Sequence, residues 1–260
     1  MCFSLGLFDQ ILHFFIKRPP FEPASIKKIL IIKLVAIGDL VVALPTLKAI
    51  REEFSKANIS LLTTPRVKEI AENIPFVDEI IYYDPFKTHR GISGILRMCF
   101  MLKNKGFDLV VELEHYYRVT TFFSYFSGAK HRVGFDLPMQ GRKGLFTIKV
   151  PYDVNKHELE VFLDMARAIG VKNTNPSLIE ISFSKEDERY VKNLLAKLTE
   201  ASSLLIGIHV GTGKSAISRR WINKRWAKLA DILIEKYNAK VIFTGAEVEK
   251  DIVAEITKYM

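Results

Sequence analysis

The chain has very little cysteine: Cys2 and Cys99 are the two that occur in 260 residues. They lie far apart and form no CxxC pair, so neither a disulfide framework nor a thiolate metal site is indicated. The sequence also lacks HExxH and GxSxG, and zinc-peptidase and serine-hydrolase chemistry therefore has no local motif. Such scarce cysteine fits a reducing cytoplasm, which is the location that we predict.

Acidic residues are in the minority, with 29 Asp and Glu against 38 Lys and Arg and a net charge of +9. This excess favours an anionic partner: a nucleotide, a phosphorylated glycolipid, an acidic membrane surface or a nucleic acid. Nucleic acid is the weakest of these, because basic and aromatic residues are not interleaved and no known module occurs. A hydrophobic content of 48% is that of a folded protein, and 260 residues suffice for one large or two modest domains.

Residues 1–27 predict an amphipathic extension. Phe8, Ile11, Leu12 and Phe15 recur at helical spacing, and a basic stretch with two prolines at 17–20 ends the helix. The apolar part is too short to span a bilayer and lacks the basic start and cleavage site of a signal peptide. Two placements stay open: peripheral contact with a membrane surface, or packing on the body of the protein.

From residue 28 onward, segments with strand and helix character alternate. This order predicts a doubly wound, mostly parallel sheet with helices on both faces, hence an α/β fold. The expected strands are 29–34, 59–63, 79–83, 109–113 and 132–135, and the expected helices are 45–54, 67–73, 92–103, 117–126 and 158–169. The glycine-rich, basic stretch 138–144 is expected to be an exposed loop.

A second unit begins after the turn at 173–176. Its expected elements are helices at 185–198, 224–236 and 248–258 and strands at 204–209 and 240–244. A free-standing doubly wound domain usually has more than two strands. This part is therefore predicted to be an incomplete Rossmann-like domain.

Residues 29–51 are the most informative stretch. A continuous apolar strand is followed by Gly38-Asp39 and then by a helix with Val41, Leu44 and Leu47 on one side. Such a turn places Asp39 at the carboxyl edge of the sheet, where open α/β folds bind ligands. Its carboxylate could take a proton from a substrate hydroxyl, or it could simply cap the helix.

A second informative stretch runs from 206 to 226. A strand leads into a loop with Gly211, Thr212 and Gly213, whose N–H groups could hold a phosphate. Positive charge follows without an acid before Ala230, at Lys214, Arg219, Arg220, Lys224, Arg225 and Lys228. The alternative is a solvated basic face. A P-loop would need a glycine five residues before Gly213. That position is Ile208, so a P-loop is not indicated.

Other residues give weaker signals. His115, Arg118, His131 and Arg132 follow expected strand ends and could line the same cleft, although isolated basic residues on loops are commonly just solvated. Trp221 and Trp226, five residues apart at a helix start, are more often packing residues than a platform for stacking.

Taken together, these stretches resemble glycosyltransferase family 9, the heptosyltransferases that build the inner core of bacterial lipopolysaccharide. The resemblance begins with KLVAIGDLV at 33–41 and LPTL at 44–47. It continues with DLVVEL at 108–113, GAKHRVGF at 128–135, HELE at 157–160, HVGT at 209–212, RRW at 219–221 and RWAKLA at 225–230. It covers residues 28–260, and the motifs occur in the order of the family.

The resemblance implies a GT-B-like architecture of two Rossmann-like domains: an acceptor-binding domain at 28–182 and a nucleotide-sugar-binding domain at 183–260. Asp39 would be the general base of an inverting transfer. Thr212, Gly213, Lys214 and Arg219 would bind the donor phosphates, and Gly38, Arg118 and Arg132 the acceptor. Neither a metal nor a resident cofactor is implied, since fixed cations would stabilise the departing diphosphate.

The implied partners are a nucleotide-sugar, ADP-heptose, and a phosphorylated glycolipid acceptor, with peripheral contact at the cytoplasmic face of the inner membrane. The family also carries a later nucleotide-sugar-binding segment of the type Asp-Thr-Gly-Pro-x-His, and this sequence stops before it. The expected C-terminal domain is therefore partial. The alternative function is a catalytically inactive relative that retains acceptor or anion binding.

Overall fold

A computed structural model describes residues 20–137, 142–198 and 204–260. The chain divides into two compact units, Met1–Ser182 and Phe183–Met260. Each is described by itself below. The amphipathic helix predicted near the N-terminus falls largely on residues 1–19, outside the described part.

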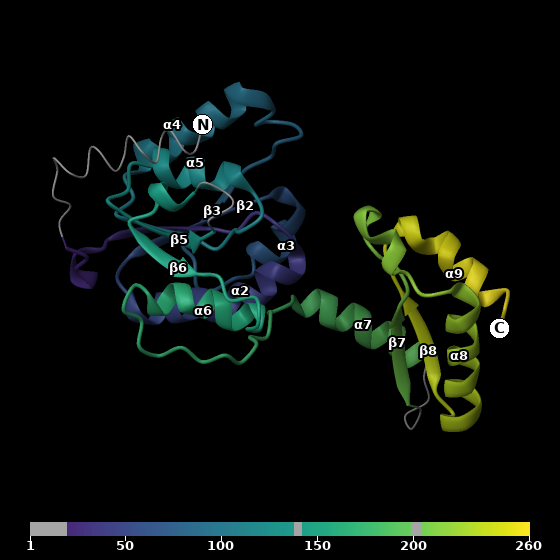
Figure 1. The fold of residues 1–260 in the computed structure, drawn as a ribbon. Coiled ribbons are helices and arrows are strands. Elements are labelled where there is room, and N and C mark those ends of the chain that lie inside the picture. The colour runs from purple at the N-terminus through teal and green to yellow at the C-terminus, as the bar shows by residue number, and fades with distance from the viewer. Residues whose placement is uncertain (1–19, 138–141, 199–203) are drawn as a thin grey trace. The chain divides into compact units, whose positions relative to one another are not determined.

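The first unit is built on a six-stranded, all-parallel sheet with the order β3-β2-β1-β4-β5-β6 (Figure 1). Its strands are β1 (Lys28–Ile32), β2 (Asn58–Thr63), β3 (Glu79–Tyr82), β4 (Leu109–Glu112), β5 (His131–Asp136) and β6 (Ile148–Pro151). The predicted doubly wound α/β fold is confirmed. The short edge strand β6 was not predicted from the sequence, because Val150 is the one buried residue among its four.

Helices cover both faces of this sheet. They are α2 (Ile37–Glu53), α3 (Lys68–Ala71), α4 (Gly91–Lys105), α5 (Arg118–Phe126) and α6 (Glu158–Arg167). Ile29 and Ile31 of β1 share a buried cluster with residues of α2 and α6. Leu30 and Ile32 instead pack with residues of α4 and α5. This division follows from the strand itself, in which successive side chains point to opposite faces.

Helix α2 begins earlier than the predicted start at residue 45. It starts at Ile37 and contains Pro45 in its interior. Proline removes one helical hydrogen bond and normally disfavours such a position. Pro45 is buried, and α2 packs against α6 along its length, so tertiary packing outweighs the local preference.

The second unit contains a two-stranded parallel sheet of β7 (Leu205–His209) and β8 (Lys240–Thr244). Its helices are α7 (Lys185–Leu198), α8 (Asn223–Tyr237) and α9 (Lys250–Thr257). Ile208, Val210, Ala227 and Ile256 form its core. A 3-10 helix, η5 (Lys214–Arg219), lies between β7 and α8. All five predicted elements of this unit are present, and its two strands pair in parallel.

Candidate active site at the carboxyl edge of the first sheet

The candidate site lies where the strand order of the first sheet reverses. The two central strands β1 and β4 are hydrogen-bonded neighbours, and the chain leaves them toward opposite sides of the sheet. A crevice at the carboxyl ends of such strands is the general ligand site of open α/β sheets. Asp39, in the first turn of α2, follows β1, and Glu114 and His115 follow β4.

Lys33 organises this edge. Its side chain is fully buried, and its Nζ lies 3.3 Å from Oδ2 of Asp39 and 3.3 Å from Oε2 of Glu114. Glu114 is buried as well and accepts hydrogen bonds from the backbone N–H groups of Val35 and Tyr116. The Asp39 side chain, in contrast, is 37% exposed. One buried cation thus holds two carboxylates, of which one reaches solvent.

The alternative that Asp39 caps α2 is wrong. The N-cap residue is Ala36, which makes no side-chain capping bond, and Asp39 is the third residue of the helix. Its charge still suits the positive end of the helix. Gly38 beside it is exposed, and no atom lies within 4 Å of the position that a Cβ would take. The backbone before Asp39 is therefore open to a ligand.

Three further polar side chains converge at the same edge. The Tyr152 hydroxyl donates to Oε2 of Glu158 at 2.8 Å and lies 3.5 Å from Nε2 of His115. Nδ1 of His115 lies 3.5 Å from Oε1 of Glu158. Burial lowers the pKa of His115, an effect that the nearby carboxylates oppose. Burial and then the Glu158 carboxylate raise the pKa of Tyr152. Asp39 is close enough to act on both groups electrostatically.

A buried cluster on β4 supports the edge from below. Oε1 of Glu112 accepts hydrogen bonds from the hydroxyls of Thr120 and Thr121, at 2.6 and 3.0 Å, and lies 3.2 Å from Nη1 of Arg142. Arg142 also donates to the backbone carbonyls of Glu114 and His115. Burial raises the pKa of Glu112 to about 7, more than Arg142 and the threonine hydroxyls lower it.

The position of Arg142 contradicts part of the prediction that residues 138–144 form an exposed loop. Residues 138–141 lie outside the described part of the chain. Arg142 itself is 1% exposed rather than solvated. Because its guanidinium holds the two carbonyls that follow β4, it fixes the backbone from which Glu114 and His115 project.

The predicted acceptor residues separate in the structure. Arg118 is exposed and begins α5, which follows β4 at the edge of Asp39. Arg132 is buried near the start of β5, where it donates to the carbonyls of Leu145 and Ala129, both at 2.8 Å. Its register partner is Val110, two residues before the end of β4. Arg132 and the neighbouring His131 therefore lie toward the amino end of the sheet, and this placement does not support an acceptor role.

The predicted phosphate loop belongs to the second unit and follows β7. Thr212 is held by Arg220, whose Nε donates to the Thr212 hydroxyl at 3.0 Å and whose Nη2 donates to the Thr212 carbonyl at 3.2 Å. Gly213 and Arg219 are exposed. The backbone of Lys214 begins η5, but its side chain lies outside what the structure describes. The sequence suggested Arg219 as the key residue and gave no separate role to Arg220.

A buried acid packs beneath this loop. A Cβ on Gly211 would lie 1.5 Å from Oε1 of Glu249, so any larger residue there would require the Glu249 carboxylate to move. Oε2 of Glu249 accepts a hydrogen bond from Ala246 N–H at 2.7 Å. Trp221 and Trp226 contact each other edge to face at 4.8 Å between ring centroids, and Trp221 is 41% exposed.

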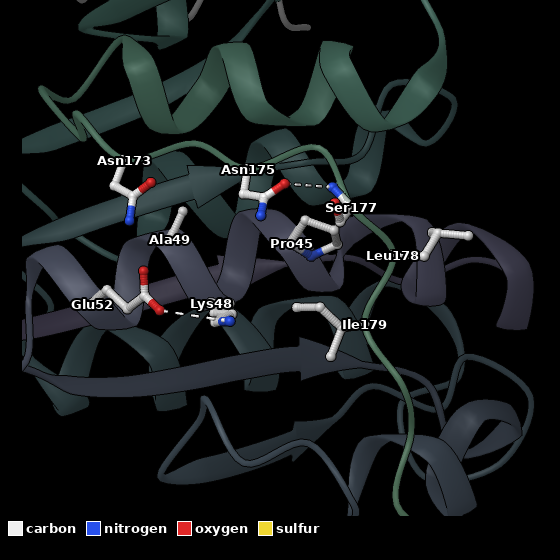
Figure 2. A pocket seen from close by; sticks show the side chains of 9 residues that line it. All are labelled: Pro45, Lys48, Ala49, Glu52, Asn173, Asn175, Ser177, Leu178 and Ile179. Carbon is white, nitrogen blue, oxygen red and sulfur yellow. Dashed lines mark hydrogen bonds and ion pairs between the residues drawn. The ribbon is translucent and has the colours of Figure 1, made fainter.

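Figure 2 shows a pocket elsewhere on the first unit, with a volume of about 170 Å³. It lies between the second half of α2 and the segment after α6, and Asp39 does not line it. Its lining residues are Pro45, Lys48, Ala49, Glu52, Asn173, Asn175, Ser177, Leu178 and Ile179. Lys48 and Glu52 form an exposed ion pair at 3.8 Å on its α2 wall. It is an open surface hollow, separate from the site at the carboxyl edge.

Among residues 20–137, 142–198 and 204–260, no three His, Cys, Asp or Glu side chains gather as a metal ion would require. Nor does any helix in these ranges have the length and apolar character needed to cross a membrane.

The fold of this chain, with its parallel-sheet units, is GT-B-like. The model of the family "Glycosyltransferase family 9 (heptosyltransferase)" matches residues 95–260. Since this is more than half of the chain, the protein belongs to glycosyltransferase family 9.

Known relatives agree with this assignment. The lipopolysaccharide core heptosyltransferase OpsX of Haemophilus influenzae is 27% identical over 238 residues, which are 89% of this chain and 64% of that protein. This chain thus spans less than two thirds of the length of that relative.

Solved structures share the fold. The glycosyltransferase family 9 protein of Veillonella parvula aligns with a TM-score of 0.76 and 22% identity, over 90% of this chain and 66% of that one. The E. coli ADP-heptose lipopolysaccharide heptosyltransferase II aligns with a TM-score of 0.68 and 19% identity, over 90% and 69%. E. coli heptosyltransferase WaaC with ADP gives a TM-score of 0.63 and 12% identity, over 89% and 71%.

Proposed function

We propose that this protein is an inverting heptosyltransferase that transfers heptose from ADP-heptose to the inner core of lipopolysaccharide in the cytoplasm. Family membership supports the class of reaction, and the names of the relatives support the donor and the acceptor. The single observation that carries the proposal is the Lys33–Asp39 pair. A half-exposed carboxylate is fixed there by a buried ammonium at the switch point of the sheet.

Asp39 acts as the general base. Lys33 engages Oδ2, which leaves Oδ1 for the hydroxyl of the acceptor sugar. As Oδ1 takes the proton, the acceptor oxygen forms a bond to the anomeric carbon of the heptose. The bond from that carbon to the phosphate oxygen breaks, and ADP leaves with the electron pair. A single displacement of this kind inverts the anomeric centre.

Cations of the second unit stabilise the leaving group. The loop at Thr212 and Gly213, together with Lys214 and Arg219, binds the diphosphate of the donor. Positive charges and backbone N–H groups at the diphosphate lower the barrier, because they stabilise charge as it develops on the departing phosphate. This role fits a metal-independent transfer. On the acceptor side, exposed Arg118 and the open backbone at Gly38 receive the phosphorylated glycolipid.

The test is transfer from ADP-heptose to a lipopolysaccharide precursor by the wild-type chain and by Asp39→Asn. The variant keeps the shape of the side chain but cannot accept the proton, so we expect turnover at least about a hundredfold lower with unchanged affinity for ADP. Asp251→Asn, an exposed change in α9, is the matched control. Near-normal turnover of Asp39→Asn would refute the base. A wild-type chain that binds acceptor and ADP without transfer would favour the inactive, anion-binding relative.

A further inference from the structure

The outer face of α4 carries large apolar side chains that the described residues leave uncovered. Ile92, Leu96 and Phe100 follow each other at intervals of four residues and are 77%, 62% and 67% exposed. This spacing aligns them along one side of the helix. Met98 and Leu102 on the opposite side are buried against the sheet. Helix α4 thus has two apolar faces. One packs against the sheet, and the other is exposed among the described residues. We call the exposed set the α4 outer face.

An aromatic rim continues this surface to the edge that holds Asp39. Phe86, Tyr116 and Tyr117 are exposed, at 70%, 68% and 49%. Phe86 lies in the loop before α4, and the two tyrosines lead into α5. Helices α4 and α5 pack against each other on the same face of the sheet. Both begin where a parallel strand has ended, so their N-termini share the carboxyl edge with α2.

The loop that carries Phe86 is held firmly. A Cβ on Gly94 would lie 2.1 Å from the backbone carbon of His89, so the loop packs directly on the first turns of α4. Oδ1 of Asp84 accepts hydrogen bonds from the backbone N–H groups of Phe86 and Lys87. The exposure of Phe86 is therefore a feature of an anchored loop.

Positive charge surrounds the apolar groups. From Tyr83 to Gly106 the chain carries five Lys and Arg residues and a single acid, Asp84. The guanidinium of Arg66 lies over the ring of Phe86 at 5.1 Å. Exposed apolar and aromatic side chains among basic residues are typical of surfaces that bind anionic lipid. A protein partner fits less well, since lysine is depleted at protein interfaces and Lys103 lies on the exposed side of α4.

We propose that the α4 outer face and the aromatic rim dock this protein on an anionic lipid bilayer. The apolar side chains enter the boundary between headgroups and acyl chains, and the basic residues contact lipid phosphates. Because the aromatic rim lies at the carboxyl edge of the sheet, docking in this way brings that edge, with Asp39, close to the bilayer, where the headgroup of a lipid-anchored acceptor lies. The lipid binding itself does not depend on the transfer reaction proposed above.

The first test is co-sedimentation of the full chain with phosphatidylcholine vesicles, with and without phosphatidylglycerol. We expect the wild type to bind the anionic vesicles preferentially. Ile92→Ser/Leu96→Ser/Phe100→Ser should bind them at least about tenfold more weakly, because the apolar contact is lost. Ile232→Ser/Ile234→Ser, which changes exposed residues of α8, is the matched control and should bind like the wild type. All of these changes are at exposed positions, and circular dichroism verifies folding.

The second test removes the charge. Arg90→Glu/Arg97→Glu should lose most of the preference for phosphatidylglycerol, since both arginines are exposed beside the α4 outer face. Wild-type binding by the triple serine variant would overturn the proposal, as would a wild type that ignores both kinds of vesicle. If Phe8→Ser/Phe15→Ser lost vesicle binding and the triple serine variant kept it, the vesicle binding would belong to the N-terminal segment instead. Self-association of the wild type that the triple variant abolishes, without vesicle binding, would identify a protein contact.

Discussion

The Nζ atom of Lys33 lies 3.3 Å from Oδ2 of Asp39 and equally close to Oε2 of Glu114, so one buried ammonium joins a buried acid to a half-exposed one. Glu114 is already satisfied by two backbone N–H groups. The additional contact with Asp39 fixes the one carboxylate of the three charged groups that can reach a substrate. Lys33 thus makes one contact in the interior, with Glu114, and one at the solvent-facing edge, with Asp39.

Removal of Lys33 should separate its contribution to stability from its contribution to turnover. Lys33→Met leaves Glu114 as an unpaired buried charge and should lower the free energy of unfolding by about 3–5 kcal/mol. Lys33→Met/Glu114→Gln removes both buried charges and should recover part of that loss, since no unpaired charge is left, while the amide oxygen can accept one of the two backbone N–H groups. Turnover should stay low in both, because Asp39 has lost its anchor. Urea unfolding and transfer assays measure the two effects, and a double variant with restored turnover would contradict the positioning role.

The raised pKa of Glu112 predicts a pH dependence of stability. Its pKa of about 7 in the folded chain compares with an ordinary value of 4.5. Between these values the folded chain keeps a proton that the unfolded chain has released, so the free energy of unfolding falls as the pH rises. The full effect is on the order of 3 kcal/mol. This contribution to the free energy of unfolding is fully present below about pH 4.5 and has been lost above about pH 7.

Glu112→Gln should flatten this part of the profile, because the amide does not titrate. Urea midpoints at several pH values between 4.5 and 7.5 measure the slope in the wild type and the variant. Glu186→Gln, an exposed change in α7, is the control and should keep the wild-type slope. Equal slopes in Glu112→Gln and the wild type would show that Glu112 does not titrate in this range.

The fold was predictable because its signals are local. Strands β1, β2 and β4 are apolar runs that burial on both faces demands, and the helices between them carry apolar residues at helical spacing. Two local signals were misleading. Pro45 suggested a helix start, whereas packing against α6 keeps it inside α2. Strand β6 has too few buried residues to be recognised.

The candidate site was predictable in part. The position of Asp39 at the strand end followed from its own neighbours. Its companions could not be found this way, because the order of strands in the sheet brings Glu114 to Lys33 and brings Tyr152 and Glu158 to His115. Arg142 shows the limit most clearly. A basic residue in a glycine-rich stretch gives a surface signal, and its buried position is explained by the Glu112 carboxylate and the two backbone carbonyls after β4.

Arg132 and Arg118 should behave differently when changed. Arg132→Ala loses hydrogen bonds to two buried carbonyls and should lower the free energy of unfolding by about 1–3 kcal/mol, with no change in the KM for the acceptor. Arg118→Ala removes an exposed charge at the site edge and should raise the acceptor KM without loss of stability. Thermal unfolding and acceptor titrations test both. A raised acceptor KM in a stably folded Arg132→Lys would return Arg132 to the binding surface.

Two adjacent arginines of the second unit give a sharper contrast. Arg220 binds the hydroxyl and the carbonyl of Thr212, so Arg220→Ala should loosen the loop and increase amide exchange around Gly213. Arg219 is exposed and has the donor-phosphate role in the proposed reaction. Arg219→Ala should therefore weaken ADP binding about tenfold or more while amide exchange in the loop stays at the wild-type level.

Calorimetric ADP titration and hydrogen exchange with mass spectrometry distinguish the two roles. Thr212→Val is the matched control for Arg220, since it removes the hydroxyl and leaves the carbonyl, and its exchange should lie between those of the wild type and Arg220→Ala. If Arg219→Ala bound ADP like the wild type while Arg220→Ala did not, the phosphate contact would belong to the inner arginine. The loop would then have to release Arg220 from Thr212 on binding, and exchange near Gly213 would rise, rather than fall, when ADP is added.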